Sequence, residues 1–285
     1  MRRGRRSRIM GVLAVLLGAM AFYPAVGQAQ LELYDNFSGT QINPDKWNGA
    51  ESFTSSSGNP NAEAQRFISR QKLRVALTTY GDVTSNSGDR SGRFGLSFPN
   101  PNPITAMQAS VTVRQALAQD CPANTAVSRA RAQLIGAFFN DGTSPGAGNR
   151  IGDILAGIQK EQSHDGFLIR AFINRCTDSG CGSSSSAVPS QTFPTPWQIG
   201  RADTLLVQWD PANNRFLYEV NPGTSREESL TLTYPLSDGL PPVTNFKNIR
   251  ASNNGANCMP PGVRTKVVMD ARFDNVKLNP EAVPD

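Results

Sequence analysis

A hydrophobic period of two runs through most of the chain and restricts it to β-structure. Apolar and polar residues alternate in short segments, among them KLRVALTT, RAQLIGAFF, FLIRAFIN and TKVVMDARF. Gly, Pro, Asn and Asp interrupt the alternation roughly every 8 to 15 positions. Short strands separated by such turns are typical of antiparallel sandwiches and barrels. We therefore predict an all-β fold, an antiparallel β-sandwich.

Helix is expected to be a minor component. The segment RQALAQD (residues 114–120) has the composition for one or two helical turns, and PDKW (residues 44–47) for one short turn. Residues 176–196 contain few apolar residues and many Ser and Pro, which predicts a long surface loop. No internal repeat or linker composition divides the chain, so we expect residues 30–285 to form one domain.

The first 29 residues have the order of a secretory signal peptide. The basic segment MRRGRRSR precedes the apolar run IMGVLAVLLGAMAF, and Gly27 and Ala29 are placed for cleavage after Ala29. A membrane span needs about 20 apolar residues, which neither this run nor any later one supplies. We therefore expect an exported protein, extracellular or periplasmic, with no membrane span in the mature chain.

Removal of this segment changes the meaning of the net charge. The full chain has 28 basic and 23 acidic residues. Residues 1–29 contain five Arg and no acid, so the remainder is formally neutral. A neutral chain lacks the overall basic character of nucleic-acid-binding proteins, and we expect no nucleic-acid partner.

Four cysteines suggest two disulfides. They stand at Cys121, Cys176, Cys181 and Cys258, and an even count in an oxidising compartment favours bridges over free thiols. Three pairings are open. Cys176 and Cys181 are close enough to close one loop, which leaves Cys121 for Cys258, and we predict this pairing. A zinc site is disfavoured, because no C-x₂-C spacing occurs and the single His is His164.

Both ends of the chain resemble one superfamily of β-sandwiches. YDNFSGTQINPDKW (residues 34–47) resembles the first strand and turn of concanavalin A-like jelly rolls, which include legume lectins, laminin G modules and family 16 glucanases. ARFDNVKL (residues 271–278) resembles their closing strand. The resemblance implies that the two chain ends lie side by side in one sheet. We further expect Phe37 and Trp47 to pack into the core and Gly39 to adopt the positive φ of a tight turn.

The catalytic pattern of family 16 glucanases is not present. That pattern, E-x-D-x-E or E-x-D-x-x-E, uses strand alternation to project acids to one face, and retaining hydrolysis needs two carboxyls about 5–5.5 Å apart. In GDILAGIQKE, the segment placed equivalently, Asp153 stands at the first acid, Leu155 at the middle one and Gly157 or Ile158 at the last. With one acid remaining, family 16 catalysis is not expected.

A candidate binding face remains. In DILAGIQKE the residues Asp153, Gln159 and Glu161 share one face, and the strands before and after it offer further polar side chains. Planar polar groups of this kind hydrogen-bond sugar hydroxyls, usually beside an aromatic platform, for which Phe193 and Trp197 are candidates. The candidate ligand-binding residues are Arg131, Gln133, Asp153, Gln159, Arg170, Asn174 and Trp197. The alternative is an ordinary solvated sheet face with Trp197 in the core, since antiparallel sheets commonly face water on one side.

The resemblance also implies a structural calcium ion near the chain ends, as in many family 16 glucanases. Asp274 matches the position of one ligand, and Asp35 lies near it if the ends pair. Calcium takes six to eight oxygens, so two acids alone do not define a site. No other cofactor is expected.

These observations together predict an exported, non-catalytic module that binds an oligo- or polysaccharide or mediates cell-surface interaction. Two alternatives stay open. One is a divergent glycoside hydrolase or polysaccharide lyase, and the other is a structural envelope or matrix protein without a small ligand. Two acids about 5–10 Å apart in a cleft would indicate the enzyme. An open concave face with an exposed aromatic residue would indicate the binding module.

Overall fold

A computed structural model describes residues 30–49, 62–143, 146, 148–259 and 264–284. Within these ranges the chain forms two antiparallel sheets and two short 3₁₀ turns, Pro211–Asn213 and Pro280–Ala282. The predicted all-β antiparallel sandwich is confirmed. The described part of the chain contains no helix of the length and apolar character needed to cross a membrane. The predicted signal peptide, residues 1–29, lies outside the described residues.

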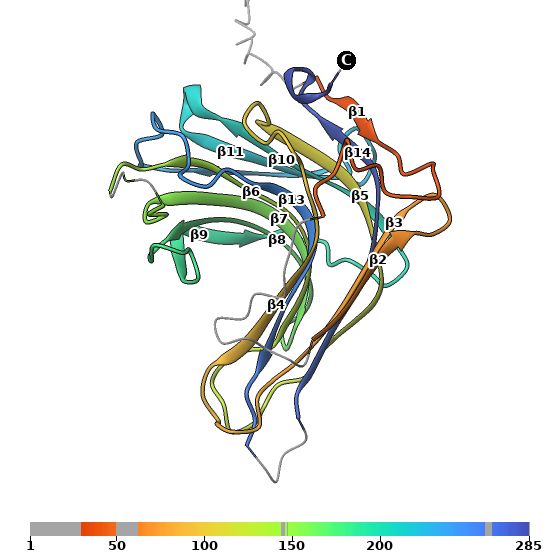
Figure 1. The fold of residues 1–285 in the computed structure, drawn as a ribbon, viewed down its shortest axis with the longest axis vertical. Coiled ribbons are helices and arrows are strands. Elements are labelled where there is room, and N and C mark those ends of the chain that lie inside the picture. Colours follow the sequence, from red (N-terminus) through yellow and green to blue (C-terminus); the bar gives the residue numbers. More distant parts are fainter. Residues whose placement is uncertain (1–29, 50–61, 144–145, 147, 260–263, 285) are drawn as a thin grey trace, which may run out of the picture.

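The first sheet has eight strands. They are β1 (Glu32–Asp35), β2 (Ala62–Ile68), β3 (Leu73–Tyr80), β5 (Ala106–Ala118), β10 (Ala202–Asp210), β11 (Arg215–Val220), β12 (Glu228–Thr233) and β14 (Lys266–Leu278). Their order is β12-β11-β10-β5-β14-β3-β2, and β1 pairs with β14. In Figure 1, β1 lies beside β14, so the two ends of the described chain share this sheet, as the resemblance implied.

The second sheet has six strands. They are β4 (Asp89–Ser97), β6 (Arg129–Asn140), β7 (Asp153–Ser163), β8 (Gly166–Cys176), β9 (Ser184–Thr192) and β13 (Lys247–Ala256). Their order is β4-β13-β6-β7-β8-β9. Strands β6, β7, β8 and β9 are therefore consecutive in sequence and neighbours in space (Figure 1).

The core between the sheets follows the alternation of the sequence. In β3, Leu73, Val75 and Leu77 are fully buried, and the residues between them are partly exposed. In β6 of the other sheet, Ala132 and Leu134 are likewise fully buried. Burial of a large apolar side chain contributes about 1.5–3 kcal/mol relative to exposure. Because the inner faces take the apolar residues, the polar residues of the same strands lie on the outer faces.

The YDNFSG segment packs as predicted, with one difference in its turn. Phe37 and Trp47 are each 2% exposed, and their rings stack with centroids 5.7 Å apart. The indole Nε1 of Trp47 donates to Asp35 Oδ2 at 2.6 Å. The prediction of a positive φ at Gly39 is wrong, because Phe37 takes it, at 51°. Asp35 Oδ1 accepts the Phe37 N–H at 2.8 Å and so holds this turn two residues earlier.

Two segments predicted to be irregular are partly strands. Most of RQALAQD belongs to β5, where Ala116 pairs with Met269 of β14, so the predicted helical turn is wrong. Within the predicted loop 176–196, Ser184–Thr192 forms the edge strand β9. The short turn predicted at PDKW is present, and the Trp47 N–H donates to Asn43 O at 3.1 Å.

Both predicted disulfides are confirmed. Cys121 pairs with Cys258 at a Cα–Cα distance of 5.4 Å, and Cys176 pairs with Cys181 at 4.8 Å. The first joins the segments that follow β5 and β13, so it links the two sheets. The second closes the loop that follows β8.

Candidate functional site

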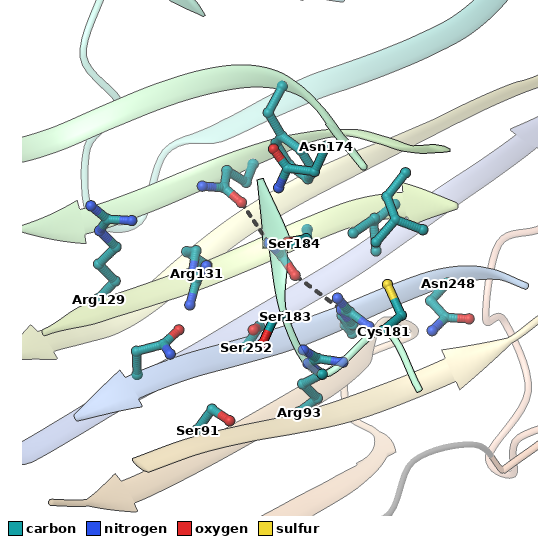
Figure 2. A pocket seen from close by; sticks show the side chains of 18 of the residues that line it. Ser91, Arg93, Arg129, Arg131, Asn174, Cys181, Ser183, Ser184, Asn248 and Ser252 are labelled. Carbon is teal, nitrogen blue, oxygen red and sulfur yellow. Dashed lines mark hydrogen bonds between the residues drawn. The ribbon is translucent and has the colours of Figure 1, made fainter. Parts of the chain in front are cut away.

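A groove of about 950 Å³ lies on the outer face of the six-stranded sheet (Figure 2). Side chains of β4, β13, β6, β7 and β8 form its floor, and β9 with residues 178–183 forms a wall. In Figure 2 the segment carrying Ser183 and Ser184 lies in front of the floor side chains. The alternation that buries Ala132 and Leu134 directs their neighbours in β6 into this groove.

One row of side chains across the floor is joined by hydrogen bonds. The strand register aligns Arg250 of β13 with Gln133 of β6, then Gln159 of β7 and Arg170 of β8. Arg250 Nε donates to Gln133 Oε1 at 2.9 Å, and Gln133 Nε2 donates to Gln159 Oε1 at 2.5 Å. Gln159 Nε2 then donates to Glu161 Oε2 at 2.6 Å. The side-chain amides of Gln133 and Gln159 each accept one hydrogen bond and donate the next. All three bonds therefore run from donor to acceptor in the same direction, from Arg250 to the carboxylate of Glu161.

That carboxylate, Glu161, is 1% exposed and sits among arginines. Its Oε1 lies 3.5 Å from Arg170 Nη2 and 3.9 Å from Arg129 Nε, yet it accepts no hydrogen bond from the described residues. Arg131 is its cross-strand neighbour. Burial lowers the pKa of Arg131 to about 10, and the attraction of Glu161 only partly opposes this. Three arginines, Arg129, Arg131 and Arg170, thus surround one carboxylate, so this part of the floor has a net positive charge.

The lining of the groove as a whole has an excess of positive charge. Among the residues that the structure describes, three acids line it, Asp89, Glu161 and Asp178, against six arginines. The arginines are Arg93, Arg129, Arg131, Arg150, Arg170 and Arg250. All except Arg93 and Arg250 have a buried Nε atom with no hydrogen-bond partner among the described residues. A buried donor of this kind is normally satisfied by protein, water or ligand.

Asp178 uses its carboxylate to shape the wall. Its Oδ1 accepts the N–H groups of Gly180 at 2.9 Å and Gly182 at 3.0 Å, and its Oδ2 accepts the N–H of Ser183. The hydrogen bonds from Ser183 and Gly182 lower the pKa of Asp178. The disulfide Cys176–Cys181 closes the same loop. The charge of Asp178 is thus satisfied within its own loop.

An apolar strip lies beside the polar row. Phe172 of β8 is the cross-strand neighbour of Gly157 in β7, which in turn pairs with Ile135 of β6. A Cβ at Gly157 would lie 2.7 Å from Phe172 Cζ, so glycine leaves the space that the ring occupies. Leu155 and Ile135 line the groove next to this ring. The floor therefore offers an aromatic and aliphatic surface adjacent to amide and guanidinium groups.

Five of the seven predicted ligand-binding residues line this groove: Arg131, Gln133, Gln159, Arg170 and Asn174. Trp197 does not. It is 1% exposed, its ring packs against Phe167, and its Nε1 donates to the backbone oxygen of Glu161 at 2.9 Å. Phe193 is 2% exposed. Neither residue presents a platform to a ligand, because both fill the interior. Among the described residues, the aromatic side chains that line the groove are Phe172 and Phe246.

Asp153 also lies apart from the groove lining. It is fully buried at the start of β7, where it accepts hydrogen bonds from Asn140 Nδ2 at 2.9 Å and Val243 N at 2.8 Å. A bulge in β6 between Ala137 and Phe139 brings Asn140 opposite Asp153. Asp153 thus holds the segment that leads into β13, and its Oδ2 lies 3.6 Å from Nε of the groove-lining Arg150.

Sequence reasoning missed the half of the groove that β13 and β4 form. In β13 the inward positions include Ile249 and Ala251, so only one large apolar residue marks this part of the strand. Four outward positions are polar and line the groove: Asn248, Arg250, Ser252 and Asn254. A polar residue at every second position from 248 to 254 is the signal that could have found the strand.

Two of the acids that line the groove, Asp89 and Glu161, are too far apart to act together on one glycosidic bond. In the strand register Asp89 lies three strands from Glu161 and four residues further along. At about 4.8 Å per strand and 3.3 Å per residue, the backbone positions are roughly 20 Å apart. Glycosidases place their two carboxyls about 5–9.5 Å apart. His164 does not line the groove and lies half-exposed at the β7–β8 turn, 3.0 Å from Asp165.

The two acids considered for calcium have other partners. Asp35 accepts hydrogen bonds from Phe37 and Trp47, and Asp274 Oδ2 pairs with Lys72 Nζ at 2.8 Å. Among the residues that the structure describes, no three His, Cys, Asp or Glu side chains gather in a way that could hold a metal ion. Asp35 and Asp274 are thus held by protein partners, and the calcium ion that the resemblance implied stays a prediction.

No protein-family model and no curated protein sequence matches the chain. Similar solved structures include a mixed-linkage-glucan GH16 protein of Bacteroides ovatus, with 12% identity over 86% of this chain and 98% of that chain at a TM-score of 0.48. A β-1,3-glucanase from Mycobacterium marinum has 13% identity over 87% and 100%, at 0.44. Lectin II from Ulex europaeus has 13% identity over 81% and 95%, at 0.33.

With TM-scores of 0.33 to 0.48, these likenesses carry no argument about this chain. Identities of 12–13% allow no transfer of residue roles. The sandwich itself is established by the two sheets of this chain, and the site by its own geometry.

Proposed function

We propose that the protein is an exported, non-catalytic module that binds a glycan in the groove of the six-stranded sheet. The observation that carries this proposal is the hydrogen-bonded row from Arg250 to Glu161, which holds amide and guanidinium groups at fixed positions on the floor of the groove. Planar donors and acceptors of this kind suit sugar hydroxyls. The groove volume of about 950 Å³ also lies within the range of ligand sites.

The apolar strip supports the same ligand class. Sugar rings have a polar rim and an apolar face, and a site that places the partly exposed Leu155 beside amide groups can contact both. Asn174 extends the polar edge on this side, since it is the cross-strand neighbour of Leu155.

The arrangement of acids supports binding without catalysis. Glu161 is buried among arginines, and roughly 20 Å separates it from Asp89 along the sheet. A hydrolase would need a second carboxyl much closer. Export is supported by the two disulfides, which are typical of oxidising compartments.

A glycan array on residues 30–285, followed by calorimetric titration of the selected glycan, tests the proposal. Arg170→Ala should weaken binding about 10- to 100-fold, because a hydrogen bond from a charged group is worth about 1.5–3 kcal/mol. Arg272→Ala is a matched control. Arg272 also lies on a strand and has a buried Nε without a partner among the described residues, but it lies in the other sheet and does not line the groove.

The control should bind within about twofold of the wild type. Circular dichroism melts of both variants establish that they fold. If no glycan is retained on the array, or if Arg170→Ala binds as tightly as Arg272→Ala, the groove is not a glycan site.

A further inference from the structure

The groove has more arginine than its own acids can match. Of its three lining acids, Asp178 is satisfied by backbone N–H groups of its own loop, and Glu161 is almost fully buried beneath the row. Asp89 lies at the far end of β4, three strands from Glu161. Among the described residues the lining carries six guanidinium groups and no lysine or histidine. Two of them are less available to a ligand, because Arg150 Nε lies 3.6 Å from Asp153 Oδ2 and Arg250 is 7% exposed.

Three of these guanidinium groups have a hydrogen-bond donor that the described residues do not satisfy. The Nε atoms of Arg129, Arg131 and Arg170 are buried and without a hydrogen-bond partner among the described residues. Glu161 makes no hydrogen bond to these Nε atoms: its Oε1 lies 3.9 Å from Arg129 Nε and approaches Arg170 through Nη2, at 3.5 Å. Guanidinium groups bind carboxylate and sulfate-like oxyanions through paired N–H donors, with bonds about twice as strong as neutral ones.

We infer that the ligand of this groove is an anionic oligosaccharide, with sugar rings that carry carboxylate or sulfate groups. The inference rests on the proposed glycan-binding function and specifies its ligand class. A neutral sugar hydroxyl could accept one hydrogen bond from an arginine, but it would leave the charge of the groove unbalanced. An oxyanion on the ring supplies both the acceptors and the opposite charge.

The spacing of the arginines favours an oligosaccharide over a single sugar. Arg170 and Arg250 occupy one row but lie three strands apart. At about 4.8 Å per strand this is roughly 14 Å, which is wider than one sugar ring. Arg129 and Arg131 lie further along β6, in neighbouring rows. A chain with acidic groups on successive rings can engage several of these positions together.

A single-stranded nucleic acid would also bring oxyanions, but the groove is less suited to it. Such ligands stack their bases on exposed aromatic side chains. Of the two aromatic residues that line the groove, Phe172 is 7% exposed and Phe246 is covered by the guanidinium of Arg150, 5.5 Å from its ring. Within the described residues the groove therefore offers no row of open rings.

Matched pairs of ligands test the inference. Galacturonate and mannuronate oligosaccharides are compared with their methyl esters, sulfated oligosaccharides with their desulfated forms, and single-stranded DNA is included. We expect at least one acidic form to bind tenfold or more tightly than its neutral partner. Its affinity should fall as the screening length shortens from about 30 Å at 0.01 M salt to about 8 Å at 0.15 M. The pair in which this preference appears identifies carboxylate or sulfate as the group recognised.

Other outcomes distinguish failure of the anionic ligand class from failure of glycan binding itself. Equal binding of acidic and neutral partners would overturn the anionic ligand and leave glycan binding standing. If no glycan of either kind binds, the proposed function fails as well. Preferential binding of single-stranded DNA over every glycan would also overturn both.

Variants show whether the groove itself is responsible. Arg131→Ala should lose about 10- to 100-fold in affinity for the acidic ligand, and Arg131→Lys, which keeps the charge, should lose less. Arg272→Ala should bind as the wild type does. Equal affinity of Arg131→Ala and Arg272→Ala, with both folded in thermal melts, would place the ligand elsewhere and overturn the inference.

Glu161→Gln gives a sharper test, because its expected effect is a gain. Glutamine keeps an oxygen to accept the Gln159 N–H but removes the negative charge that competes for the arginines. The acidic ligand should then bind several-fold more tightly. Weaker binding in a folded Glu161→Gln protein would mean that the carboxylate itself accepts from ligand hydroxyls, which would contradict recognition of an anion.

Discussion

The disulfide Cys121–Cys258 should contribute more to stability than Cys176–Cys181. The first ties together segments that leave different sheets and spans a separation of 137 residues. The second spans a separation of 5 residues within one loop. In the chain-entropy account a cross-link stabilises the fold by restricting the unfolded chain, and this effect grows with the logarithm of the loop length.

For these two separations the chain-entropy relation gives about 5 kcal/mol and about 2 kcal/mol. The double variant Cys121→Ala/Cys258→Ala should therefore be about 3 kcal/mol less stable than Cys176→Ala/Cys181→Ala. Both variants remove the same atoms from buried positions, so the comparison isolates loop closure. At about 2–4 °C per kcal/mol for a domain of this size, the Tm values should differ by roughly 6–12 °C. Denaturant unfolding under reversible conditions measures the free-energy difference directly.

For ligand affinity, in contrast to stability, loss of Cys176–Cys181 should have the larger effect of the two disulfides. Cys181 lines the groove, and its loop carries Asp178 and Ser183, which form the wall. Opening this loop should weaken binding several-fold, while loss of Cys121–Cys258 should leave the affinity of the folded protein within about twofold. Equal losses of stability in the two double variants would refute the loop-closure reasoning. An affinity loss confined to the Cys121/Cys258 variant would refute the placement of the groove.

Three further perturbations concern buried charges. Asp203→Asn should destabilise the fold by about 3–5 kcal/mol, because it leaves Lys160 as a buried charge without its carboxylate. Lys160→Met should destabilise it less, because Asp203 keeps two arginines and an asparagine as partners. Denaturant unfolding at neutral pH compares the two variants, and a larger loss of stability in Lys160→Met would contradict this reasoning. Burial lowers the pKa of Lys247 to about 7, below its unfolded value of about 10.4, so unfolding takes up a proton between these pH values. The stability of the wild type relative to Lys247→Met should rise with pH in that window, by at most about 1.4 kcal/mol per unit, and a flat difference would exclude a lowered pKa. Asp153→Asn should lower stability by about 1–3 kcal/mol, because the buried donors of Asn140 and Val243 lose their charged acceptor. Glycan affinity, measured by calorimetry, should not change. A loss of affinity in the folded variant would mean that Asp153 takes part in ligand binding.

The period-two pattern is sufficient to predict the fold class and much of the groove. Once a segment is a strand, parity alone assigns each residue to a face. Gln133, Gln159 and Arg170 share one face of the sheet because β6, β7 and β8 follow one another as hairpins, and consecutive strands are usually neighbours. The disulfide pairing follows from the number and spacing of the cysteines.

The alternation of faces along a strand does not predict how deeply a side chain is buried, where a bulge occurs, or which polar segments form strands. Asp153 has the parity of the groove residues, but the bulge in β6 turns that end of the strand into a buried network with Asn140. Strands β9 and β13 carry few large apolar residues, so their conformation depends on pairing with neighbouring strands. That pairing is a property of the assembled sheet, and a local hydrophobic pattern does not record it.

The strand β7 shows how the interior supports the groove. Lys160 and Glu161 are adjacent and point to opposite faces, and each is fixed from the core side. Lys160 Nζ pairs with Asp203 of the other sheet at 2.9 Å, and the indole of Trp197 donates to the backbone oxygen of Glu161. Binding costs less when the groups that meet a ligand are already ordered. Trp197, the aromatic residue expected to contact a sugar, therefore lies in the interior. There it stabilises the strand whose outer face carries Gln159 and Glu161.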